Sequence, residues 1–158
     1  MQKVPLIIVF VFFFLCNSAK AQKFYLGNYL TPTENEFQLL GISSKSNVYR
    51  YKYKKEIYDN FYNRKIGEII VGIKNGYIVQ TIYYLIPKST DVGVPQDIID
   101  LIQSNIPYKL GYNNGVYGMN IDNESISIAR LNNSITFNKD RIMINNSVKQ
   151  SILEKTGN

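Results

Sequence analysis

Four acidic residues form the one group in this sequence whose types and spacing could support catalysis. Asp91, Asp97 and Asp100 lie around the start of an expected helix, and Glu68 lies in an expected strand before it. Two carboxylates that face each other about 5 to 10 Å apart across a cleft can hydrolyse a glycosidic bond. Stabilisation of the helix dipole explains Asp97 and Asp100 equally well. A carboxylate-dependent hydrolase is therefore only an alternative interpretation.

The composition excludes most other catalytic chemistry. The chain has 158 residues, no His, one Cys and no Trp. Without His, a Ser-His-Asp triad, a His general base and a His-ligated zinc site are all excluded. No Asp-x-Asp-x-Asp calcium loop, P-loop or glycine-rich dinucleotide motif is present. We therefore expect no cofactor, no metal site and no enzymatic activity.

A strand that alternates Tyr with cations is a candidate binding surface. Residues 48–54 place Tyr49, Tyr51 and Tyr53 on one face of the strand. The polyanion-binding hypothesis uses the basic residues of this region, which are Arg50, Lys52, Lys54 and Lys55. Rings and cations on opposite faces suit an edge strand whose Tyr rings rest on the sheet and whose Lys residues prevent edge-to-edge association. Binding of an acidic polymer, such as lipopolysaccharide, nucleic acid or an anionic polysaccharide, is an alternative function.

An ion pair is expected near the end of the chain. Arg130 lies on a mostly apolar face of the expected last hairpins and needs an anion, and Asp140 is the candidate. The pair could be a structural bridge or the edge of an anion-binding pocket. We favour the structural bridge.

The first 21 residues have the features of a secretory signal peptide. Residues 4–15 form an apolar run, and Ala19-Lys20-Ala21 is a small-x-small cleavage site. We expect cleavage after Ala21, a single domain over residues 22–158, and a periplasmic or extracellular location in a Gram-negative bacterium. Lipidation of Cys16 is the alternative, and Leu15 argues against it. The leader carries Lys3, Lys20 and no acid, so its removal lowers the formal net charge from +6 to +4.

The clearest structural element is a hairpin over residues 66–86. Asn75-Gly76 tolerates the positive φ angles of a two-residue turn, which fixes the register of the two strands. This register pairs Lys74 with Tyr77, Ile73 with Ile78, and Val71 with Gln80. It predicts an apolar face that also holds Gln80, which would need a hydrogen-bonding partner there. The apolar residues expected on that face are Ile69, Val71, Ile73, Ile78 and Ile82.

One helix is expected over residues 96–105, preceded by Pro95 and with one apolar stripe. The rest of the chain reads as short strands. Turns at 113–115, 122–123 and 132–133 predict a meander in which Met119 faces Ile126 and Ile128 faces Phe137. Residues 31–41 could begin as a capped helix, whereas 37–42 could equally form a strand.

Strands around one helix, without regular βαβ alternation, predict an α+β fold. The mostly antiparallel sheet of hairpins would pack on the helix over residues 96–105. The alternative is an all-β barrel with one helix.

The leading functional hypothesis is a small exported, non-catalytic binding module of unknown partner. Its contact surface would be the Tyr-rich face of the hairpin, because Tyr offers a large, stiff contact area with a polar tip. The residues expected to contribute are Glu68, Lys74, Tyr77 and Tyr83.

Overall fold

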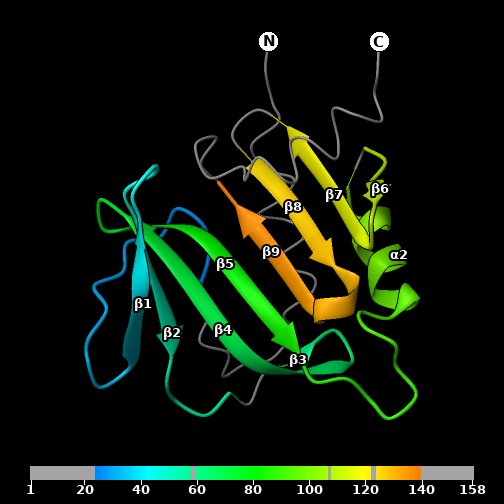
Figure 1. Cartoon of the computed structure of the whole chain (residues 1–158), viewed down its shortest axis with the longest axis horizontal. Coiled ribbons are helices and arrows are strands. Elements are labelled where there is room, and N and C mark those ends of the chain that lie inside the picture. The colour runs from blue at the N-terminus through cyan, green and yellow to red at the C-terminus, as the bar shows by residue number, and fades with distance from the viewer. Residues whose placement is uncertain (1–23, 58–59, 107, 122–123, 140–158) are drawn as a thin grey trace.

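The computed structural model describes residues 24–57, 60–106, 108–121 and 124–139. The expected leader, including Cys16, and Asp140 lie outside these ranges. The described residues form one open, mostly antiparallel sheet with a single helix, which confirms the α+β prediction (Figure 1). The sheet is not closed into a barrel, so the barrel alternative is wrong.

Nine strands of the sheet lie within the described ranges. They are β1 (Phe37–Ser43), β2 (Val48–Tyr53), β3 (Asn60–Phe61), β4 (Arg64–Lys74), β5 (Tyr77–Leu85), β6 (Gly111–Asn113), β7 (Val116–Ile121), β8 (Glu124–Ala129) and β9 (Ser134–Asn138). Their order is β1-β2-β4-β5-β9-β8-β7-β6, and β3 pairs with β4. β1 and β6 are therefore the end strands among the described residues.

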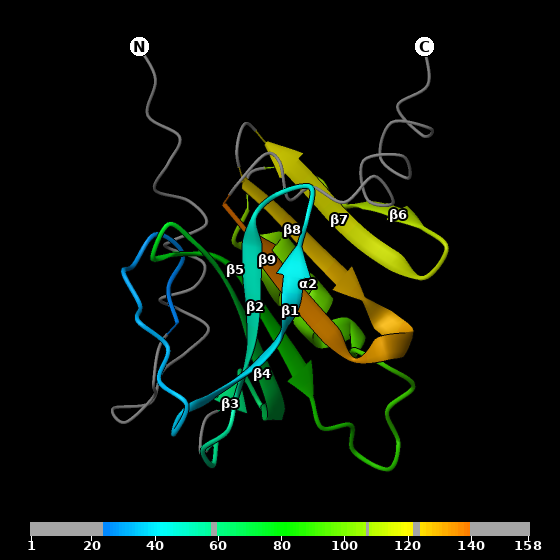
Figure 2. The same ribbon diagram turned by 60° about the vertical axis from the view of Figure 1, so that its left-hand side comes forward.

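The helix α2 (Gln96–Ser104) follows β5 and lies on one side of the twisted sheet (Figure 2). The expected helix over residues 96–105 is confirmed, with Pro95 at its N-cap. Its side chains Ile98, Ile99 and Ile102 are buried in the core. No helix within the described ranges is long and apolar enough to cross a membrane.

The core lies between α2 and one face of the sheet, called here the core face. Tyr117, Met119, Ile126, Ile128, Ile135 and Phe137 share this face, as expected. Met119 faces Ile126 and Tyr117 faces Ile128 as predicted. Ile128, however, faces Ile135 and not Phe137. The turn is longer than expected, because residues 130–132 form a 3-10 helix and Asn133 takes a positive φ of 52°.

A β-bulge changes the second half of the predicted hairpin. Lys74 pairs with Tyr77 and Ile73 with Ile78, but Gly72 then pairs with Gln80. The extra residue Val79 in β5 shifts every later side chain of that strand to the other face. Gln80 and Ile82 therefore leave the core face. Thr81 and Tyr83 enter it.

Of the two alternatives for residues 31–42, the strand is correct. Residues 37–42 lie in β1, and no helix forms over residues 31–41. Phe24 covers the core near the start of β1, where its ring meets those of Phe37 and Tyr53 at centroid distances of 5.7 and 5.2 Å. The Tyr face of β2 is thus the core face. The expectation that this strand lies at an edge of the sheet is wrong, because β2 pairs with both β1 and β4.

Candidate binding site

The tip of the β4–β5 hairpin presents a pair of exposed tyrosines. Asn75 and Gly76 form the turn with φ angles of 53° and 81°, which are the positive values expected of Asn-Gly. Tyr77, the first residue of β5, is 51% exposed, and Tyr29 beside it is 69% exposed. Their rings meet edge to face, with centroids 5.5 Å apart. We call Tyr29 and Tyr77 the tyrosine pair.

The backbone of residues 27–30 holds Tyr29 in place. The amide of Leu30 donates to the carbonyl of Gly76 at 2.8 Å, and the amide of Ile78 donates to the carbonyl of Asn28 at 2.9 Å. The amide of Gly27 donates to the carbonyl of Ile78 at 2.7 Å. This segment therefore lies along the start of β5.

Gly76 provides the space for the Tyr29 ring. A Cβ atom at residue 76 would lie 2.4 Å from Cε2 of Tyr29, which is far inside van der Waals contact. Any larger residue at this turn would displace the ring as well as strain the backbone. The tyrosine pair is therefore exposed on a backbone that hydrogen bonds hold in place.

The four residues of the leading hypothesis do not lie together in the structure. Tyr77 is exposed at the tip, and Lys74 is half-buried opposite it. Glu68 lies near the other end of β4, where it forms an ion pair with Lys52. The expectation that Tyr83 is a surface residue is wrong. It is only 3% exposed because the bulge at Val79 turns it into the core.

The basic residues of the β2 region all have partners within the protein. Arg50 Nε donates to Oε1 of Gln80 at 3.1 Å, and Lys52 is paired with Glu68. Lys54 Nζ donates to the carbonyl of Glu34 at 2.7 Å. Lys55 forms an ion pair with Glu36, which raises the pKa of the Lys55 ammonium. These cations do not converge on one site.

A row of polar side chains crosses the sheet on the face opposite the core. Gln80 accepts from Arg50 and donates from Nε2 to Oδ1 of Asn138 at 2.8 Å. Asn138 Nδ2 in turn donates to Oγ of Ser125 at 2.9 Å. The predicted need of Gln80 for a partner is thus met, although on the other face. Gly72 leaves room for this row, since its Cβ would lie 2.9 Å from Cβ of Gln80.

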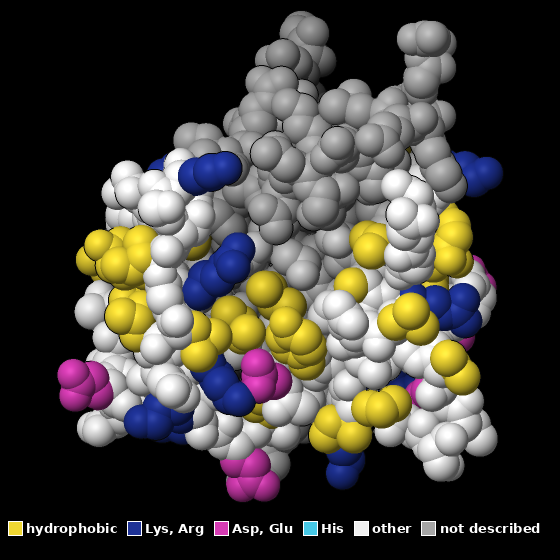
Figure 3. Space-filling model, in the orientation of Figure 1, with side chains coloured by type: hydrophobic (Ala, Val, Ile, Leu, Met, Phe, Trp, Pro, Cys, Tyr) yellow, Lys and Arg dark blue, Asp and Glu magenta, His cyan; other side chains and the backbone are white. Residues whose placement is uncertain are grey.

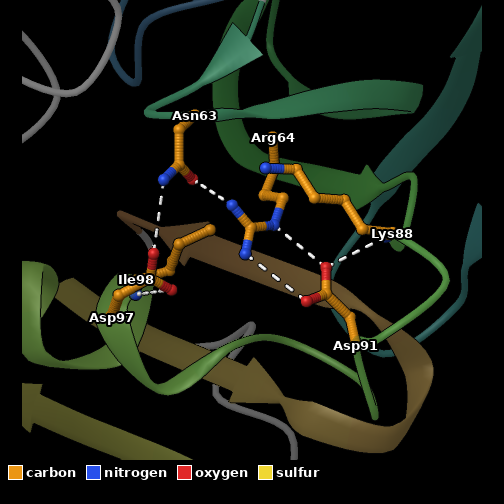
Figure 4. Close-up of polar contacts among 6 residues, drawn as sticks. All are labelled: Asn63, Arg64, Lys88, Asp91, Asp97 and Ile98. Atoms are coloured by element: carbon orange, nitrogen blue, oxygen red, sulfur yellow. Dashed lines mark hydrogen bonds and ion pairs between the residues drawn. The ribbon is translucent and has the colours of Figure 1, made fainter.

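The carboxylates considered for hydrolysis are held by other groups (Figure 4). Arg64 donates two hydrogen bonds to the Asp91 carboxylate, from Nε at 3.0 Å and from Nη2 at 3.4 Å. Both side chains are about nine-tenths buried. The hydrogen bond from Arg64, followed by one from the Lys88 amide, lowers the pKa of the Asp91 carboxyl below its ordinary value. Asp97 accepts from Nδ2 of Asn63 and from the Ile98 amide.

Asp100 and Arg130 complete the predicted sites. Asp100 accepts from Nε2 of Gln96 on the surface of α2. Within the described ranges, no three His, Cys, Asp or Glu side chains gather in a way that could hold a metal ion. Arg130 lies in the 3-10 helix, where its carbonyl accepts from the Val94 amide at 2.8 Å. The proposed Arg130–Asp140 ion pair stays a prediction, because Asp140 lies outside the described residues.

Comparison with known proteins adds no functional assignment. No protein-family model, curated protein or solved structure matches the chain.

Sequence reasoning missed two features of these sites. Tyr29 lies 48 residues before Tyr77, and the isolated bridge between them depends on tertiary packing. Arg64 and Asp91 are 27 residues apart and belong to different elements. The Asn-Gly turn could have suggested that an aromatic residue covers its glycine, but nothing in the sequence identifies Tyr29 as that residue.

Proposed function

We propose that this protein is an exported, non-catalytic binding module that contacts its partner through the tip of the β4–β5 hairpin. The observation that carries the proposal is the tyrosine pair, which is exposed and held by backbone hydrogen bonds and by Gly76. Export is inferred from the sequence of residues 1–21.

Rigid exposed tyrosines suit a contact surface for two reasons. Tyrosine is enriched among the residues that contribute most to binding energy, since it combines a large apolar area with a polar tip. A segment whose backbone is already held by hydrogen bonds loses less conformational freedom when a partner covers it. Lys74, opposite Tyr77, gives the same tip a cationic group that favours a partner with acidic or polar groups at the rim of the contact.

The arrangement of the carboxylates supports a non-catalytic role. A general acid needs a raised pKa, whereas the Arg64 guanidinium favours the ionised form of Asp91. Asp97 and Asp100 serve as acceptors at the start of α2. The acidic-polymer alternative has less support, because Arg50, Lys52, Lys54 and Lys55 already have acceptors within the protein.

The experiment is quantitative capture of partners from the native envelope with immobilised protein. The Tyr29→Ala/Tyr77→Ala double variant should lose most of the specifically captured material while its melting temperature changes little. Tyr108→Ala is the matched control, since Tyr108 is 47% exposed and lies between α2 and β6, outside the hairpin. Equal capture by the double variant and the wild type would refute the assignment of the site.

A parallel measurement addresses the acidic-polymer alternative. Retention on heparin should be weak and should not depend on the tyrosine pair. Strong retention that falls steeply between low and moderate salt would instead favour the alternative.

A further inference from the structure

β1 is an end strand whose outer edge is open in the described part of the chain. It pairs with β2 along one edge, and no described strand pairs with the other. Three of its aliphatic side chains are about half exposed: Leu39 at 51%, Leu40 at 48% and Ile42 at 55%. An open edge presents backbone donors and acceptors that only another extended strand can satisfy in series.

Apart from a β-bulge, β1 lacks the common protections of an edge strand. Its sequence, FQLLGIS, contains no Lys, no other charge and no Pro, and it is seven residues long. The opposite end strand, β6, is protected by its length of three residues. β1 has one irregularity, a bulge between Leu39 and Gly41. Hydrophobic side chains gather on the side of the molecule where Figure 1 places β1 (Figure 3).

The bulge places two of these three side chains, Leu39 and Ile42, on the same face of the strand. Leu39 pairs with Tyr51 and Ile42 pairs with Tyr49, and the two tyrosines alternate onto the same face of β2. Leu39 and Ile42 therefore share that face, although they are three residues apart. Tyr49, which is 43% exposed, adjoins them.

The charges beside β1 have opposite signs at its two ends. Glu34 and Glu36 precede the strand, with Glu36 already paired to Lys55 of its own chain, and Lys45 follows the strand in the turn to β2. An antiparallel copy of the strand would bring the acidic end of each chain to the basic end of the other. A parallel copy would bring like charges together, which costs free energy.

We propose that β1 pairs antiparallel with β1 of a second copy of this chain, with Leu39 opposite Ile42 of the other copy. In this register Leu40 faces Gly41. The apolar match of Leu39 with Ile42 selects the register. A two-fold axis between Leu40 and Gly41 relates the chains, so each contact occurs twice and the assembly closes as a dimer.

The size of this contact predicts a weak dimer. Two seven-residue strands and their neighbouring side chains bury less than the roughly 1,200 Å² of a stable standard-sized interface. A dissociation constant of about 1 to 100 µM follows for a contact of this class. The proposal does not depend on the tyrosine pair, which belongs to another part of the sheet.

Sedimentation velocity over a concentration series tests the dimer. The wild type should change from monomer to dimer across that range, and Ile42→Lys should raise the dissociation constant at least tenfold. Leu131→Lys is the matched control, because Leu131 is 73% exposed in the 3-10 helix and should leave dimerisation unchanged. A wild type that stays monomeric at several hundred micromolar, or an Ile42→Lys variant that dimerises normally, would overturn the proposal.

Disulfide trapping tests the register without relying on a charged substitution. Cys16 is the only cysteine of the chain, so a Cys16→Ser background allows single cysteines to be placed on β1. A mixture of Leu39→Cys and Ile42→Cys chains should cross-link, since directly opposite residues have Cα atoms about 4.5 to 5.5 Å apart. Leu39→Cys alone should not, because the two copies of residue 39 are offset by about 10 Å along the strands. Equal cross-linking in both samples would contradict the register.

Discussion

Replacing Tyr83 with alanine should destabilise the protein strongly, because this side chain is in the core and not on the surface. Tyr83 is 3% exposed, and its ring meets Phe61 and Phe137 at centroid distances of 5.8 and 6.3 Å. Removing a buried aromatic ring of this kind costs about 3 to 5 kcal/mol. At roughly 4 °C per kcal/mol for a domain of this size, the melting temperature should fall by about 10 to 20 °C.

The assay is urea unfolding followed by far-UV circular dichroism, with Tyr77→Ala as the matched control. Tyr77 has the same side chain in the same hairpin but is 51% exposed, so its replacement should cost about 0.5 kcal/mol or less. Tyr83→Phe keeps the ring and should lose only about 1 kcal/mol.

The comparison depends directly on the bulge at Val79. An uninterrupted register would pair Glu68 with Tyr83 and place Tyr83 on the face opposite the core. If Tyr83→Ala and Tyr77→Ala lowered the free energy of unfolding by similar small amounts, the bulged register would be refuted.

Three further predictions concern glycine packing, pH and processing. Gly72→Ala should lower the free energy of unfolding by about 1 to 3 kcal/mol, since the new Cβ would lie 2.9 Å from both Gln80 Cβ and Val48 Cγ1. Gly111→Ala, whose Cβ would meet only the Gly118 carbonyl oxygen at 3.6 Å, should be neutral or slightly stabilising in the same denaturant assay, and equal losses would contradict the packing argument. Arg64 lowers the pKa of Asp91 in the folded state, so the stability from this pair is present above the unfolded pKa of about 4 and is lost as the pH falls through the folded value. Asp91→Asn should therefore show a shallower loss of stability in acid than the wild type, and identical pH profiles would count against the pair. N-terminal sequencing of the exported protein should find Gln22 as the first residue, whereas a chain that begins at a lipidated Cys16 would show the lipoprotein alternative to be correct.

The elements that follow from local signals were predicted well. Asn75-Gly76 determines its own turn, and the first two pairs of that hairpin follow from it. The helix follows from its apolar spacing between Pro95 and Asn105. Pairing of β7 with β8 follows from a two-residue loop and alternation.

The features that depend on tertiary packing could not be derived in the same way. Val79 is an ordinary β-branched residue, so the sequence does not indicate a bulge there. With the bulge, Thr81 and Tyr83 face the core and Gln80 faces the other side. Gln80, which the bulge places on the face opposite the core, then donates a hydrogen bond to Asn138, and Asn138 donates one to Ser125. The turn after β8 is longer than its Asn-Asn pair suggests, because residues 130–132 form a 3-10 helix; the Arg130 carbonyl accepts a hydrogen bond from the Val94 amide.

Only the part of the candidate site next to the turn could be predicted from the sequence. Tyr77 and Lys74 lie at the tip because both adjoin the turn that fixes the register. Glu68 lies too far along β4 to join them, and Tyr83 is buried. Tyr29 completes the site through contacts that connect it to Gly76, a residue 47 positions away in the sequence.

Protection of the tyrosine pair in the native envelope tests the central claim most directly. Hydroxyl-radical footprinting should label Tyr29 and Tyr77 in the purified protein and should label both much less in freshly isolated envelope that contains it. Tyr62 and Tyr108, which are 52% and 47% exposed, should be labelled equally in both samples, and Tyr83 in neither. Equal labelling of Tyr29 and Tyr77 in the two samples would contradict a role for the hairpin tip in binding.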